Sequence, residues 1–123
     1  MAEVEKMVCI ATHASDCPEK AAMPFVMANA ALSMDVEVTV ILQGAGVFLA
    51  LKGFADKLVH AGGFPPLKKL VGDFLELGGE LKVCGPCIKE RAMDESDLIE
   101  GSTTIAGAEV VIKTLEANSV LTY

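Results

Sequence analysis

Short runs of apolar residues alternate along this chain with segments whose apolar positions recur at helical spacing. The run Met7–Thr12 is followed by a polar loop, after which Pro18 can open a helix that continues to about Leu32. Val36–Gln43 is rich in β-branched residues and stops at a glycine-containing segment, as a strand does. The pattern therefore predicts a β-then-α unit followed by the strand of a second unit.

The middle of the chain predicts two more helices and a third strand. Residues 47–63 have the spacing of a helix that Gly62 and Gly63 would end. Pro65 and Pro66 can start the next helix, which we expect to continue to about Leu77. Its predicted buried stripe consists of Leu67, Leu70, Val71 and Phe74. A strand over Glu80–Cys84 follows.

The last third predicts a strand over Ser102–Ile105, a helix over about Gly107–Ala117 and a closing strand over Ser119–Tyr123. Five short strands alternating with helices are typical of a doubly wound α/β fold. We therefore predict a single domain over residues 1–123 with three layers, α/β/α, and a mainly parallel five-stranded sheet. The strand order cannot be read from the pattern.

Composition adds an expectation about partners. Hydrophobic residues make up 52% of the 123 residues, and the mean hydropathy is +0.47, so part of the apolar surplus is expected in a subunit interface. The uncharged runs are too short to span a membrane. A net charge of −7 disfavours binding to nucleic acid or to anionic lipid and suits a basic protein partner.

The compartment bears on how the four cysteines are interpreted. The first residues, MAEVEK, carry two glutamates where a secretory signal would be basic, so we expect a cytoplasmic protein. Thiols stay reduced in the cytoplasm. A close cysteine pair there indicates catalysis or metal binding more than a structural disulfide.

Three loops that follow predicted strands carry the candidate chemistry. HASDC follows the first strand, QGAG the second and CGPC the third. In a parallel sheet these loops share the edge formed by the carboxyl ends of the strands. His13 and Cys17 are therefore expected near Cys84, provided that the first and third strands are close. We interpret Gly44 and Gly46 as a tight turn.

The pair Cys84 and Cys87 has three interpretations. The two thiols could cycle as a disulfide, although a thioredoxin fold is disfavoured because the chain has no Trp and no Pro after Pro86. They could join His13 and Cys17 as zinc ligands, which is chemically sensible but weakly indicated by the spacing. In the third interpretation, one reactive thiolate accepts and passes on a sulfane sulfur.

The third interpretation favours Cys84 as the reactive thiol because this residue ends a strand and precedes a helix. Helix N–H groups, together with Lys82, Lys89 and Arg91, are expected to favour its thiolate. Such a carrier needs no metal and no bound cofactor. Cys87 would assist, release the sulfur as a resolving thiol or only pack. Cys9 lies within the first strand and is expected to be buried and inert.

The C-terminal third also resembles a known family. VCGPCIKERAMDESDLIEG, followed by IAGAEVVIKTLEANSVLTY, is similar to the DsrE/DsrF-like sulfur-relay family and most closely to its YchN-like branch. The shared motifs are C-x-x-C with an Arg soon after, D-L-I-x-G, and a closing A-x-x-V-L-T-aromatic.

This resemblance implies a function and partners. The family's single reactive cysteine corresponds to Cys84, which would carry sulfane sulfur as a persulfide and pass it to a partner cysteine. Relatives pass persulfide sulfur between cysteines of small carrier proteins, so a small sulfur-carrier protein is an expected partner. Family members form trimers or hexamers, which implies a homotrimer or homohexamer here. Whether this makes the chain a sulfurtransferase or a carrier is left open.

Overall fold

The strands form one five-stranded sheet in a computed structural model that describes residues 3–58 and 62–123. They are β1 (Lys6–Ala11), β2 (Glu37–Leu42), β3 (Glu80–Cys84), β4 (Ser102–Ile105) and β5 (Ser119–Thr122). Their order across the sheet is β4-β3-β2-β1-β5, and every neighbouring pair is parallel. The predicted α/β fold is confirmed, and no strand end differs from its predicted position by more than one residue.

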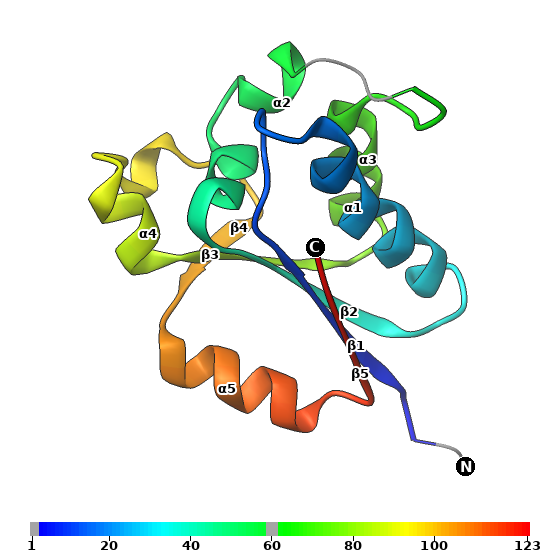
Figure 1. Ribbon diagram of the computed structural model, residues 1–123. Helices are drawn as coiled ribbons and strands as arrows, with labels where there is room; N and C mark the ends of the chain where they lie inside the picture. Colours follow the sequence, from blue (N-terminus) through cyan, green and yellow to red (C-terminus); the bar gives the residue numbers. More distant parts are fainter. Residues whose placement is uncertain (1–2, 59–61) are drawn as a thin grey trace.

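Helices cover both faces of this sheet (Figure 1). The α-helices are α1 (Pro18–Leu32), α2 (Phe54–Lys57), α3 (Leu67–Glu76), α4 (Gly85–Glu90) and α5 (Gly107–Glu116), and the 3₁₀-helices are η1 (Gly44–Ala50) and η2 (Glu95–Asp97). Helices α1 and α3 lie on one face and α5 on the other, which gives the predicted three layers. None of the described helices is long and apolar enough to cross a membrane.

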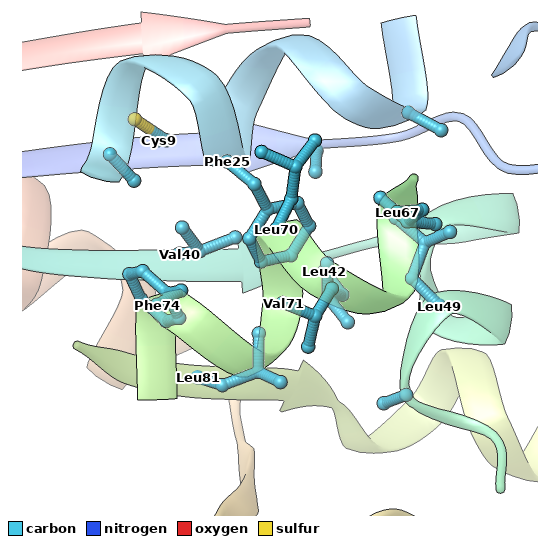
Figure 2. Packing of buried hydrophobic residues seen from close by; sticks show 14 of the residues in the cluster. Cys9, Phe25, Val40, Leu42, Leu49, Leu67, Leu70, Val71, Phe74 and Leu81 are labelled. Carbon is cyan, nitrogen blue, oxygen red and sulfur yellow. The ribbon is translucent and has the colours of Figure 1, made fainter. Parts of the chain in front are cut away.

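The main core lies between the sheet and the α1/α3 layer. Alternate residues of β2, Val40 and Leu42 among them, point into this layer because successive side chains of a strand face opposite sides (Figure 2). The rings of Phe25 from α1 and Phe74 from α3 meet edge to face, with centroids 5.6 Å apart. The stripe predicted for α3 is buried as expected: Leu67, Leu70, Val71 and Phe74.

The opposite face is covered much more thinly. Its buried cluster consists of Val8, Ile41 and Ile105, against which Val110 of α5 packs. No residue of α5 is fully buried. Three apolar side chains of this helix remain more than half exposed: Val111, Ile112 and Leu115.

The helix predicted over residues 47–63 is wrong. In the described part of this segment, the chain instead forms η1, leaves it at Leu51 in an extended conformation, and makes the single turn α2. Leu51 forms an antiparallel bridge with Leu98, and Gly53 takes a left-handed φ of 81°. Pairing with a distant segment therefore outweighs the local helical spacing. His60 lies outside the described residues.

Candidate functional site: a thiol pair at the carboxyl edge of the sheet

The carboxyl ends of β1, β2 and β3 meet at one edge, so the three predicted loops do share it. The loop after β2 is not a simple tight turn, because η1 begins at Gly44 and packs over the end of β1. A Cβ atom on Gly46 would lie 2.2 Å from the carbonyl oxygen of Ala11, so only glycine fits there. This close approach fixes η1 between the ends of β1 and β3.

Cys84 is the last residue of β3 and immediately precedes α4. Its side chain is half-buried and its thiol is free. Cys84 is the N-cap residue of α4 and Cys87 is its third helical residue, near enough for its side chain to raise the pKa of the Cys84 thiol. The strand end predicted from the sequence therefore holds a close pair of reduced sulfurs.

The electrostatic environment of Cys84 differs from the expected one. Desolvation and then the hydrogen bond to the Cys87 side chain raise the pKa of the Cys84 thiol. The Cys87 backbone N–H and the Arg91 charge act in the opposite direction but are outweighed. The start of the helix and Arg91 do favour the thiolate, as expected, but burial beside a second sulfur outweighs their effect on the pKa.

Of the three predicted cations, Arg91 is the one whose charge favours the Cys84 thiolate. The ammonium of Lys82 donates a hydrogen bond to Thr103 Oγ1 at 2.8 Å, across to strand β4. Lys89 is exposed on α4. Arg91 is thus the basic residue that the structure associates with the pair.

Cys87 is held from two sides. The backbone N–H of Gly44 donates to Cys87 Sγ at an N···S distance of 3.4 Å. Arg91 donates from Nη1 to the carbonyl oxygen of Cys87 at 3.1 Å, and its guanidinium lies 5.9 Å from the centroid of the Phe48 ring in η1. Cys87 is therefore anchored to the loop that follows β2.

Sequence reasoning missed Gly44 and Phe48 as parts of this site. A backbone donor leaves no side-chain signal, and Phe48 was assigned to a regular helix. The glycine spacing after β2 was the available signal, since a glycine at the end of a strand often marks a close backbone approach.

His13 and Cys17 occupy the loop after β1, at the shared edge. His13 Nδ1 lies 2.6 Å from Asp16 Oδ2, within the same loop, and Cys17 precedes α1. Strand β2 separates β1 from β3, which places the two strands about 10 Å apart by ordinary strand spacing. A supporting role for His13 and Cys17 stays a prediction.

The four-ligand zinc set is not assembled by the fold. In the part of the chain that the structure describes, no three His, Cys, Asp or Glu side chains gather closely enough to hold a metal ion. Cys9 is fully buried, as predicted, and burial raises the pKa of its thiol to about 11. Cys84 and Cys87 are therefore left as the candidate chemical centre.

Among the hollows that the described residues form, two bear on the position of the site. One, of about 400 Å³, is lined by Gly85, Pro86 and Lys89 of α4 together with Thr104 and Glu109. A larger one, of about 570 Å³, lies at the amino ends of the strands, beside Lys6, Glu37 and Glu80. The hollow of about 400 Å³ lies against the CGPC segment, whereas the one of about 570 Å³ is at the opposite edge of the sheet.

A model of the DsrE/DsrF-like family matches residues 5–123. The chain belongs to this family. In Methanocaldococcus jannaschii it is similar to the uncharacterized protein MJ0989, with 33% identity over 118 residues, 96% of this chain and 99% of that protein. The uncharacterized protein MJ0760 of the same organism is 36% identical over 118 residues, and the chain spans 42% of its length.

Solved structures show the same fold. The crystal structure of the E. coli ychN protein superposes with a TM-score of 0.81 at 21% identity, covering 98% of this chain and 100% of that one. MTH1491 of Methanobacterium thermoautotrophicum, a protein of unknown function, gives a TM-score of 0.75 at 14% identity, with the same coverage. The first of these agrees with the YchN-like branch that the C-terminal motifs predict.

Proposed function

We propose that this DsrE-like chain is a sulfur-relay protein that carries sulfane sulfur as a persulfide on Cys84 and passes it to a cysteine of a partner protein. The observation that carries the proposal is the position of Cys84. Its free, partly exposed thiol ends β3 at the edge where sites form in such sheets, beside Cys87 and under the influence of Arg91. Family membership supports a sulfur-relay type of function in general.

The transfer consists of two exchange steps. The thiolate of Cys84 attacks the terminal sulfur of a donor persulfide, an S–S bond breaks, and the donor leaves as a thiolate while Cys84 becomes a persulfide. A partner thiolate then attacks the terminal sulfur on Cys84, which returns to the thiolate form. No electrons are gained or lost overall, so the relay needs neither an external oxidant nor a cofactor.

The same proposal assigns two kinds of partner. A small sulfur-carrier protein with a basic surface would complement the net charge of −7. A further copy of this chain would cover the exposed apolar side chains of α5, Val111, Ile112 and Leu115, in a homotrimer or homohexamer. A reducing compartment such as the cytoplasm would keep the thiols free for exchange.

A second candidate function is a thiol redox or binding module in which Cys84 and Cys87 cycle as a disulfide. The observation that favours it is that both thiols are free and lie at the first turn of α4, three positions apart. A disulfide removes two hydrogens from the protein, whereas a persulfide adds one sulfur.

Intact mass after incubation with inorganic polysulfide separates these functions. We expect Cys87→Ser, and the wild-type chain and Cys17→Ser when sampled soon after mixing, to gain the mass of sulfur that a reductant removes, and Cys84→Ser to gain none. Loading that persists in Cys84→Ser and disappears in Cys87→Ser would overturn the assignment. Loss of two hydrogens with no sulfur uptake by any variant would favour the redox module.

A further inference from the structure

Hydrogen bonds hold Cys87 at both its side chain and its backbone. Its sulfur accepts the Gly44 N–H and its carbonyl oxygen accepts Arg91 Nη1, so both ends of the residue are fixed against neighbouring groups. The Gly44 contact crosses from the loop after β2 to the helix after β3, 43 positions further along the chain. A side chain fixed in this way has a defined direction of attack.

The direction of that attack is toward Cys84. Cys84 is the N-cap residue of α4 and Cys87 is the third residue of its first turn, so both side chains lie at the same end of this helix. The Cys87 side chain is near enough to raise the pKa of the Cys84 thiol. Cys84 ends the strand and Cys87 lies inside α4, where Ile88 beside it is buried. An incoming sulfur species therefore bonds to Cys84 with Cys87 already beside it.

We propose that Cys87, positioned by the Gly44 N–H, is a resolving nucleophile that displaces whatever sulfur species is bonded to Cys84. With a persulfide, the Cys87 thiolate attacks the Cys84 sulfur, the bond to the terminal sulfur breaks, and hydrosulfide leaves as a Cys84–Cys87 disulfide forms. The sulfane sulfur is thereby reduced to sulfide while the two cysteine thiols are oxidised, so electrons balance. Low-molecular-weight thiols then reduce the disulfide and restore the pair.

With this step, the persulfide on Cys84 can react in two ways. The inference rests on the proposed function for the source of that persulfide. A docked partner thiolate that arrives first takes the sulfane sulfur. Otherwise Cys87 attacks the persulfide on Cys84, and the terminal sulfur leaves as hydrosulfide. Cys87 would then limit how long an unclaimed, reactive persulfide stays on the protein surface.

An aromatic disulfide tests the resolving step without any persulfide. In a Cys17→Ser background, Cys84 and Cys87 are the thiols that a reagent in solution can reach, because Cys9 is fully buried. With 5,5′-dithiobis(2-nitrobenzoate), reaction at Cys84 releases one thionitrobenzoate and attack by Cys87 releases a second. We expect the background protein to end as an internal disulfide and the added Cys87→Ser substitution to leave a lasting mixed disulfide on Cys84. A lasting adduct in both proteins would overturn the inference.

A second arm follows polysulfide-loaded protein in the same two variants. We expect Cys87→Ser to hold sulfur on Cys84 longer by roughly tenfold or more, because it lacks the intramolecular nucleophile. The background protein should meanwhile release hydrosulfide and lose two hydrogens. Equal lifetimes would overturn the inference but leave the proposed function standing. If no variant takes up sulfur while the aromatic disulfide is still resolved, the proposed function fails and the resolving role of Cys87 stands.

Discussion

The backbone N–H of Gly44 donates a hydrogen bond to the sulfur of Cys87 across a distance of 3.4 Å. This contact joins the loop after β2 to the cysteine motif after β3, so two consecutive strands build the thiol site together. Phe48, four residues after Gly44, also receives the guanidinium of Arg91 over its ring. The pair therefore depends on the exact placement of η1 as well as on its own spacing.

The reactivity of Cys84 should increase with pH across the neutral to alkaline range. Burial and the neighbouring sulfur raise the pKa of its thiol, so less thiolate is present at neutral pH than for an ordinary cysteine. Replacing Cys87 with serine removes a sulfur whose hydrogen bond and charge both raise that pKa. We expect the midpoint of Cys84 alkylation by iodoacetamide to move to lower pH in Cys87→Ser. A midpoint that is unchanged or higher would contradict this account of the site.

Arg91 should assist Cys84 through its charge. The guanidinium is the cation that lowers the pKa of this thiol, so Arg91→Gln should move the alkylation midpoint to higher pH and slow sulfur loading at neutral pH. Lys89→Gln is the matched control, because it removes the same charge from the exposed side of α4. High salt should weaken the effect of Arg91. Equal shifts from both substitutions would indicate a general surface-charge effect instead.

Gly46 should be required for the placement of η1. A Cβ atom there would meet the carbonyl oxygen of Ala11, so Gly46→Ala should lower the free energy of unfolding by about 1–3 kcal/mol. Gly72→Ala is the control, because this glycine lies in α3 with open space around it and should gain about 0.5–1 kcal/mol. Urea denaturation measures both. A Gly46→Ala protein as stable as wild type would show that η1 does not need this close approach.

The exposed face of α5 should mediate self-association. Leu115 is 80% exposed, so a charge placed there costs an isolated subunit little but would be buried unpaired in an interface. We expect light scattering to give a trimer or hexamer for the wild-type chain and smaller species for Leu115→Glu. Glu116→Gln is the control at the next position of the helix. A wild-type monomer at micromolar concentration would remove the proposal.

Most elements could be predicted because their signals are local. Helix α1 begins at Pro18 and ends at Leu32 as expected, and strands β3 and β4 match their predicted bounds. The segment after β2 could not be predicted in the same way. Its helical spacing competes with the bridge between Leu51 and Leu98, a tertiary contact that no local pattern reports.

The candidate site could likewise be predicted where its signal is local and not where it depends on tertiary contacts. A cysteine directly after a strand indicates Cys84, whereas the donor to Cys87 is a backbone N–H and has no residue signature. The electrostatic prediction was correct for the helix start and Arg91 but incomplete, because spacing shows which charges are near and not how deeply a thiol is buried. The zinc set failed because strand order, which is set by packing, places β2 between the two loops that would supply its ligands.

The most direct test of the central claim is to locate the loaded sulfur. Protein treated with inorganic polysulfide is alkylated, digested and analysed by peptide mass spectrometry, with the Cys87→Ser variant prolonging the loaded state. The account predicts an alkylated persulfide on the peptide that contains Cys84, lost when the sample is reduced before alkylation and absent from Cys84→Ser. A persulfide found on Cys17 or Cys87, with Cys84 alkylated as a plain thiol, would contradict it.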